Sequence, residues 1–221
     1  MALLAQVELP GDAVTNTEDA YEQIAAALTP EAVSTPLVRL CRLIAQAGLL
    51  DRSEIVLPAD RRRQAQLLAL REAVPEAVNR RVADAQRRSP AVQKTAADMI
   101  VSFDRFEKSL AVFRGTFDRH SLDYATWGHI SDGNVHPNVI PHRVEDVERG
   151  QTAILECGRE IISMGGCPLA EHGVGRNVVK QTLLRELYGV EGIEQIRAIK
   201  RALDPTWRLA RGVLFPAPPD V

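Results

Sequence analysis

All five histidines of this 221-residue chain fall between positions 120 and 172. Two of them, His129 and His136, flank an Asp-Gly pair in the segment YATWGHISDGNVHPNVI at 124–140. Asp-Gly between two β-prone runs favours a two-residue type I′ hairpin, because both turn positions need positive φ. Such a hairpin places His129 directly opposite His136. Opposed side chains share a sheet face with Cβ atoms about 5 Å apart, so the two imidazoles could bind one metal ion.

The period-2 alternation of strands adds further polar residues to this face. It places Asn134 and Asn138 beside the histidines, with Trp127 as the cross-strand partner of Asn138. Pro137 lacks an N–H group and predicts an edge strand or a bulge. The alternative interpretation of the histidine pair is that it only hydrogen-bonds within a polar sheet face.

A third metal ligand is available in the glycine-rich segment 165–176, where Glu171 precedes His172. Two histidines and one carboxylate leave a coordination position open, which is typical of a catalytic rather than a structural metal site. Cys167 is another candidate ligand, but a small buried cysteine is the expected state. His120 and His142 lie outside these motifs and are expected at the surface.

Helices and short strands must position these residues. The periodicity predicts two strands, over 3–9 and 99–101. It predicts helices that start near Asn16 or Thr17 and after Ser102, and further helices over 37–44, 145–164 and 192–203. A long helix is predicted over 59–88, with Pro75 as a break or kink. The helical stripe of Tyr21, Ile24, Ala25 and Leu28 is expected to pack inward. The order of elements predicts one α+β domain.

One helical face after Ser102 carries four of the five phenylalanines: it contains Phe103, Phe106, Leu110, Phe113 and Phe117. An aromatic stripe could line a cofactor pocket. At this spacing, however, a core-facing helix is the favoured interpretation.

Composition excludes several classes of protein. With 27 Lys and Arg against 29 Asp and Glu, the formal net charge is −2, so there is no basic footprint for nucleic acid. Three widely spaced cysteines without a CxxC pair argue for a reducing compartment. Charges interrupt every apolar stretch before the length of a membrane span, and the start has no signal-peptide pattern. The sequence therefore predicts a cytoplasmic protein, with Arg176, Lys180 and Lys200 on solvated helix faces.

Three motifs resemble one known family, the C-terminal domain of FAD-linked oxidases such as D-lactate, glycolate and D-2-hydroxyglutarate dehydrogenases of the vanillyl-alcohol oxidase superfamily. The motifs are Gly128-His129-x-x-Asp132-Gly133-Asn134-x-His136-x-Asn138, Glu171-His172-Gly173-x-Gly175-Arg176 and Ile199-Lys200-x-x-Leu203-Asp204-Pro205. A looser match extends upstream through Arg71-Glu72 and Lys94-Thr95-Ala96-Ala97-Asp98.

The resemblance implies a ferredoxin-like antiparallel sheet with helices packed on one face, the cap that supplies the substrate side of a flavin site. It implies this domain over residues 1–215, a Pro-rich tail at 216–221, and an N-terminal FAD-binding domain that is absent from this chain. The implied partners are that FAD-binding domain or subunit and a small 2-hydroxy carboxylate substrate. A homodimer is considered as well.

The family's functional residues carry over by position. His129, His136 and Glu171 correspond to the ligands of a divalent metal, usually zinc. His172 corresponds to the catalytic base. Asn138 corresponds to a residue beside the flavin and the substrate, and Asn134 is placed with it on the cofactor side. Arg71 corresponds to a binder of the substrate carboxylate, and Lys94 to a second one.

The implied reaction is oxidation of a D-2-hydroxy acid by proton abstraction and hydride transfer to flavin. Two alternatives stay open at this point. A His/His/Glu metal site with a bound water also suits a metallohydrolase. A non-catalytic binding or assembly module could keep the same fold, although it has no physical need for all four residues of the site.

Overall fold

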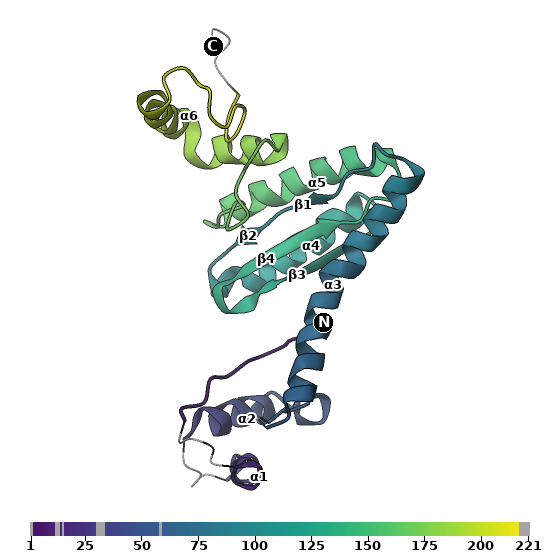
Figure 1. Cartoon of the computed structure of the whole chain (residues 1–221), viewed down its shortest axis with the longest axis vertical. Coiled ribbons are helices and arrows are strands. Elements are labelled where there is room, and N and C mark those ends of the chain that lie inside the picture. Colours follow the sequence, from purple (N-terminus) through teal and green to yellow (C-terminus); the bar gives the residue numbers. More distant parts are fainter. Residues whose placement is uncertain (1, 12–13, 15, 30–33, 58, 217–221) are drawn as a thin grey trace. The chain divides into compact units, whose positions relative to one another are not determined.

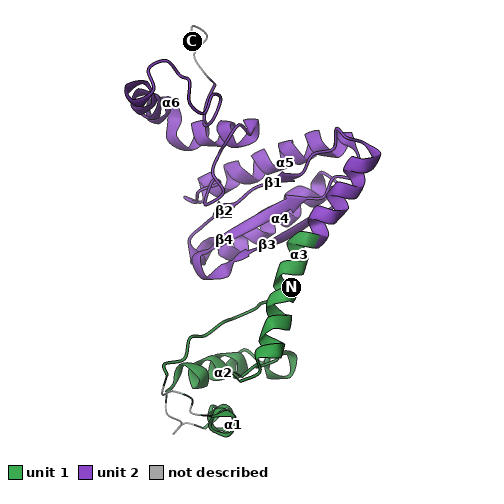
Figure 2. Ribbon diagram, in the orientation of Figure 1, with its two compact units in different colours: residues 1–76 green, residues 77–221 purple. Residues whose placement is uncertain are grey.

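A computed structural model describes residues 2–11, 14, 16–29, 34–57 and 59–216. The chain forms two compact units, residues 1–76 and 77–221 (Figure 2). Helices and an antiparallel sheet occur together, which confirms the predicted α+β class. Most of the predicted Pro-rich tail, residues 217–221, lies outside the described residues. Among the described helices, none combines the length and the apolarity that crossing a membrane requires.

The first unit contains helices α1 (Thr17–Ala26) and α2 (Pro36–Gln46), the short 3-10 helix η1 (Leu50–Arg52) and the first part of helix α3 (Arg61–Arg88). Both short helices have capped starts. Asn16 accepts the N–H of Asp19 at 2.9 Å, as predicted for α1, and Thr35 accepts the N–H of Val38 at 3.2 Å. A small core joins the two helices: Ala20, Ala27, Leu37, Val38, Cys41 and Leu57.

Three predictions for this unit need correction. No strand forms over residues 2–9, where Leu3 is 67% exposed and no neighbouring strand supplies hydrogen bonds. The apolar stripe of α1 is also displaced, because Tyr21 and Leu28 are exposed while Ala20 and Ala27 are buried. Finally, α3 is continuous across Pro75 and does not end there.

The second unit is built on an antiparallel sheet of β1 (Thr95–Ala96), β2 (Met99–Ile100), β3 (Tyr124–His129) and β4 (Asn134–Val139) (Figure 1). β3 pairs with the whole of β4, so β1 and β2 both lie along the other side of β4. β4 is therefore the central strand.

The proline of this central strand corrects another prediction. Pro137 is buried and paired with Thr126, so it lies neither on an edge strand nor in a bulge. Its carbonyl oxygen accepts the N–H of Ala97 at 3.0 Å, but a proline has no N–H to return the bond. The missing bond lies where the neighbouring strand is divided into β1 and β2.

The hairpin between β3 and β4 has a longer loop than the sequence predicted. His129 pairs with Asn134 and Trp127 with His136, and residues Ile130–Asp132 form the 3-10 turn η3. Within this turn region only Gly133 has positive φ (+77°), so the type I′ requirement of two positive values is not met. The predicted direct pairs of His129 with His136 and of Trp127 with Asn138 are therefore wrong.

Helices α4 (Phe106–Arg119) and α5 (Val144–Ser163) pack on one face of the sheet and enclose the main core. Phe113 and Phe117 are fully buried there, which confirms the core interpretation of the phenylalanine stripe. Phe103 is 71% exposed, because it belongs to the short 3-10 helix η2 (Phe103–Arg105) that precedes α4. On the opposite face, Val78 and Val82 of α3 pack with Ala125 and Trp127.

The chain ends with α6 (Val178–Leu203), which is capped by Asn177 and interrupted at Gly189, where φ is +69°. The sequence predicted the part of this helix from 192 to 203 and its end before Asp204, but missed residues 178–191. A separate core packs around this helix: Val174, Leu184, Ile193, Trp207 and Phe215.

Asp146, in the first turn of α5, predicts a measurable pH dependence of stability. Burial alone would raise the pKa of Asp146. Hydrogen bonds to its carboxylate outweigh burial and lower the pKa from 3.8 to about 2. The donors are the backbone N–H groups of His142 and Arg143 and the guanidinium groups of Arg149 and Arg143. This shift corresponds to at most about 2–3 kcal/mol, and solvent screening reduces it to about 1 kcal/mol.

We expect Asp146→Asn to lower the free energy of unfolding by about 1 kcal/mol at neutral pH. Because the folded-state pKa is depressed, the difference from the wild type is present above pH 3.8 and disappears as the pH falls toward 2. Urea titrations between pH 2 and pH 7 measure this. A difference that is constant with pH would contradict the assignment.

The glycine of the hairpin loop gives a second prediction. A Cβ on Gly133 would collide with the backbone oxygen of Val101, whereas one on Gly165, with the same φ of +77°, meets no atom within 4 Å. Gly165→Ala should cost about 1 kcal/mol through its φ alone. Gly133→Ala should cost about 1–3 kcal/mol more, because the hairpin must shift. Equal losses in chemical denaturation would show that the close approach to Val101 is unimportant.

Candidate functional site

The two hairpin histidines lie on the same face of the sheet even though their register differs from the predicted one. The observed pairing differs from the predicted pairing by two residues, and a shift of two preserves the face to which each side chain points. His129 and His136 are thus diagonal neighbours, with ring centroids 5.7 Å apart in an edge-on arrangement. His129 is exposed at the end of β3, whereas His136 is buried in β4.

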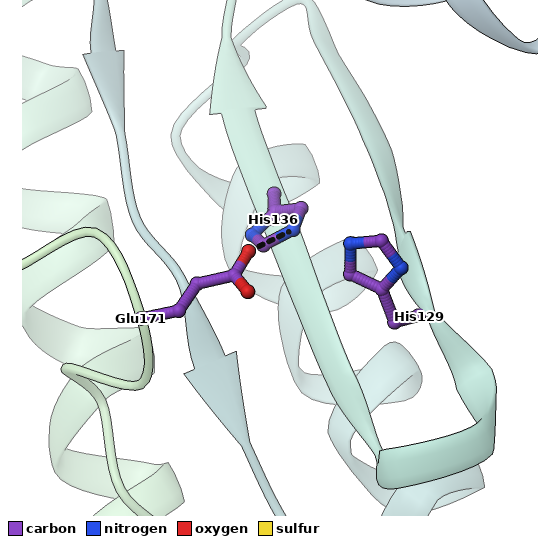
Figure 3. A group of neighbouring side chains, drawn as sticks. All are labelled: His129, His136 and Glu171. Atoms are coloured by element: carbon purple, nitrogen blue, oxygen red, sulfur yellow. Dashed lines mark ion pairs between the residues drawn. The ribbon is translucent and has the colours of Figure 1, made fainter.

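Glu171 reaches this face from the loop that follows α5. The loop is attached to the edge of the sheet, since Ile100 and Cys167 exchange two backbone hydrogen bonds of 2.9 Å. Glu171 Oε1 lies 3.1 Å from His136 Nε2, and Figure 3 shows the carboxylate reaching toward this imidazole with the ring of His129 beside it. One ligand atom from each of the three residues lies within 4.8 Å of the others.

The chemistry of this cluster fits a divalent cation. Two imidazoles and one carboxylate form the ligand set of a catalytic zinc site. Burial, and then the neighbouring His172, lower the pKa of His136, which favours the neutral, metal-binding form of the ring. Its Nδ1 atom is also buried without a hydrogen-bond partner among the described residues.

His172 lies against the same cluster. Its ring stacks on that of His136, with centroids 4.7 Å apart and an angle of 26° between the planes. Nδ1 is 3.3 Å from Asp98 Oδ2, and Nε2 is 3.2 Å from Glu171 Oε1. The side chain is 55% exposed, so this imidazole is accessible to a small molecule.

Asp98 is a residue of the site for which no role was predicted from the sequence. It is fully buried between β1 and β2, and it accepts the N–H of Glu171 at 2.7 Å and the Nζ of Lys180 at 3.1 Å. Lys180 is only 13% exposed, so its expected place on a solvated helix face is wrong. An acid within the apolar run AADMIV at 96–101 was the available signal, because acids are rarely buried unless they are paired.

Asn134 and Asn138 share the face of His136 on β4, as the alternation predicts, and both are buried. Asn138 donates from Nδ2 to the backbone oxygen of His136 at 2.7 Å. The Oδ1 atom of Asn134 is buried with no hydrogen-bond partner among the described residues. Because an unsatisfied buried acceptor is costly, Asn134 has capacity for a donor that comes from outside this chain.

The two predicted carboxylate binders differ in their surroundings. Lys94 places Nζ 2.8 Å from Asn79 Oδ1 and 5.5 Å from the ring centre of Trp127, the register partner of His136. Partial desolvation lowers the pKa of this ammonium group. Arg71 is exposed on the part of α3 that belongs to the first unit, whereas Lys94 and the hairpin belong to the second.

The remaining histidines lie outside this cluster. His142 is exposed, as predicted, and its Nε2 lies 3.0 Å from Asp123. His120 is partly buried rather than fully at the surface, and its Nε2 lies 3.0 Å from Glu156. Cys167 is partly buried and contributes backbone hydrogen bonds to the sheet edge.

Comparison with known proteins finds several relatives, and the names of three of them indicate an enzymatic activity. Glycolate oxidase subunit GlcD of Bacillus subtilis is 33% identical over 99 residues, which are 44% of this chain and 21% of that protein. A probable mitochondrial D-lactate dehydrogenase of Danio rerio is 27% identical over 118 residues, 52% of this chain and 23% of the relative. A D-2-hydroxyglutarate dehydrogenase of Xanthomonas citri pv. viticola is 33% identical over 101 residues, 42% and 20% respectively.

The matched segments thus span about a fifth of the length of each of these relatives. The family model described as FAD linked oxidases, C-terminal domain, matches residues 2–214, almost the whole of this chain. This match confirms the resemblance that the three sequence motifs indicated. The chain belongs to the family of FAD linked oxidases, C-terminal domain.

Proposed function

We propose that this chain is the substrate- and metal-binding catalytic domain of an FAD-dependent oxidoreductase that oxidises a D-2-hydroxy acid similar to lactate, glycolate or 2-hydroxyglutarate. The convergence of His129, His136, Glu171 and His172 on one sheet face carries this proposal. The names of the relatives support the substrate class. The domain extends over residues 1–215, and its location is cytoplasmic; dimer formation stays a prediction.

His129, His136 and Glu171 would hold the divalent cation, for which zinc suits the ligand set. When bound, such a cation supplies a Lewis acid that lowers the pKa of a coordinated hydroxyl group and orients the substrate. His136 is fixed within the central strand, while Glu171 extends from a loop attached to the sheet edge. The hairpin and the loop thus contribute ligands from two separate parts of the chain.

His172 is the proposed base. Its Nδ1 lies beside the buried Asp98, whereas Nε2 lies on the side of the proposed metal ligand Glu171. Nε2 is therefore the proposed acceptor of the proton of the substrate hydroxyl group. Arg71 and Lys94 are the proposed binders of the substrate carboxylate, and the planar fork of Arg71 suits two parallel charge-assisted bonds. The Trp127 ring and Asn79 position the Lys94 ammonium group for this purpose.

FAD, held mainly by a separate FAD-binding domain or subunit, supplies the acceptor for the substrate hydride. On this chain, the proposed flavin-side residues are Asn134 and Asn138. The unpartnered, buried Oδ1 atom of Asn134 supports this role, because it needs a donor that the described residues do not provide.

The ligand assignment predicts which substitutions remove the metal. His129→Ala, His136→Ala and Glu171→Gln should each lower zinc affinity by at least about 100-fold, because each removes one of three protein ligands. Calorimetric zinc titration of the full chain measures the affinity, and elemental analysis after dialysis measures retention. His142→Ala is the matched control, since this histidine faces Asp123 instead. Zinc binding that survives all three substitutions would refute the site.

The base assignment is tested in this chain combined with its FAD-binding domain or subunit. His172→Ala should slow flavin reduction by a D-2-hydroxy acid by about 10²–10⁴-fold while zinc stays bound. Stopped-flow absorbance of the flavin measures the rate, and His120→Ala is the control. Undiminished reduction would exclude His172 as the base, and hydrolysis without flavin would favour the metallohydrolase alternative.

A further inference from the structure

We propose that Asp98 and Lys180 form a buried ion pair that positions the Glu171–His172 segment against the hairpin histidines. Asp98 and Lys180 are thus positioning residues that act through their neighbours. The catalytic meaning of the pair rests on the proposed function. Its effect on the loop does not, and can be measured without flavin or substrate.

The Asp98 carboxylate is the common partner of consecutive residues in the loop. The backbone oxygen of Asp98 accepts the N–H of Ala170 at 3.2 Å, and Oδ1 accepts the N–H of Glu171 at 2.7 Å. Oδ2 lies 3.3 Å from Nδ1 of His172. One residue of the sheet edge therefore contacts three successive residues, and among them are a proposed metal ligand and the proposed base.

Lys180 secures the same segment from the side of α6. Its Nζ lies 3.1 Å from Asp98 Oδ2 and donates to the backbone oxygen of Gly173 at 2.8 Å. The backbone N–H of Lys180 is itself held by the Asn177 cap at 3.1 Å. The ammonium group thus supplies the charge that a fully buried carboxylate requires, and it holds the residue that directly follows His172.

Two carboxylates hold the His172 ring from opposite sides. Nδ1 lies 3.3 Å from Asp98 Oδ2, and Nε2 lies 3.2 Å from Glu171 Oε1. Because Asp98 also accepts the N–H of Glu171, it contributes to both contacts and so helps to place the ring beside His136.

A purely structural ion pair would stabilise the fold without affecting the ring or the segment. Asp146 provides the matched comparison, because it is also buried, accepts backbone N–H groups and pairs with cationic side chains. It lies in the first turn of α5, whereas the Glu171 loop follows the last turn.

The experiment uses the full 221-residue chain with Asp98→Asn, Lys180→Met, the double variant, and Asp146→Asn as control. NMR-detected hydrogen exchange reports the N–H groups of Ala170 and Glu171. In the wild type we expect both amides to be protected. Asp98→Asn and Lys180→Met should speed this exchange at least tenfold, while Asp146→Asn leaves it unchanged.

Zinc titration of the same proteins adds a second readout. Each single variant should weaken zinc binding by about 10–100-fold, as is typical for residues that orient a ligand. The double variant should lose less than the product of the two single losses, because it leaves no unpaired buried charge. If Asp98→Asn does not fold, the double variant gives the same readout of exchange.

The proposal is overturned if the Asp98 and Lys180 variants lower Tm but leave the amide exchange and the zinc affinity at wild-type values. Failure of the proposed function looks different. In that case the wild type binds no zinc and supports no flavin reduction, while the exchange rates still respond to the pair. In the flavin-complete protein, Asp98→Asn should lower kcat more than it raises KM, since the substrate carboxylate binders are unchanged.

Discussion

A fully buried carboxylate at the sheet edge constrains the second unit of this chain. Asp98 has no exposure to water, so its charge must be balanced and its oxygens must find donors inside the protein. Lys180 supplies the charge, and the backbone of the 170–171 segment supplies N–H groups. The first turn of α6 and the loop after α5 are thereby attached to the same edge of the sheet. Glu171 and His172 take their positions from this arrangement.

The histidine face of the hairpin follows from a simpler rule, the alternation of side chains along a strand. The sequence predicted the right face but the wrong register, because an Asp-Gly pair indicates a tight turn and the actual loop includes the 3-10 turn Ile130–Asp132. The error was two residues, and an even shift does not exchange the faces. The pairing of His129 and His136 as neighbours was therefore predictable, whereas the identity of their cross-strand partners was not.

Other features depended on contacts between distant parts of the chain. Asp98 and Lys180 are 82 positions apart, and no local pattern links them. Pro137 occupies a central strand because β1 and β2 tolerate one missing hydrogen bond. The first part of α6 escaped prediction since Gly189 interrupts its periodicity. By contrast, the cap at Asn16 and the buried Phe113 and Phe117 followed from local signals alone.

The residues of the site are therefore held in position in two different ways. His136 belongs to the central strand, which has neighbours on both sides, so its position is set by the ladder. Glu171 and His172 lie on a loop, where the backbone alone fixes little. One oxygen, Glu171 Oε1, lies 3.1 Å from His136 Nε2 and 3.2 Å from His172 Nε2, and so connects the proposed ligands to the proposed base. Small displacements of the loop change both relations at once, because the same oxygen takes part in each of them.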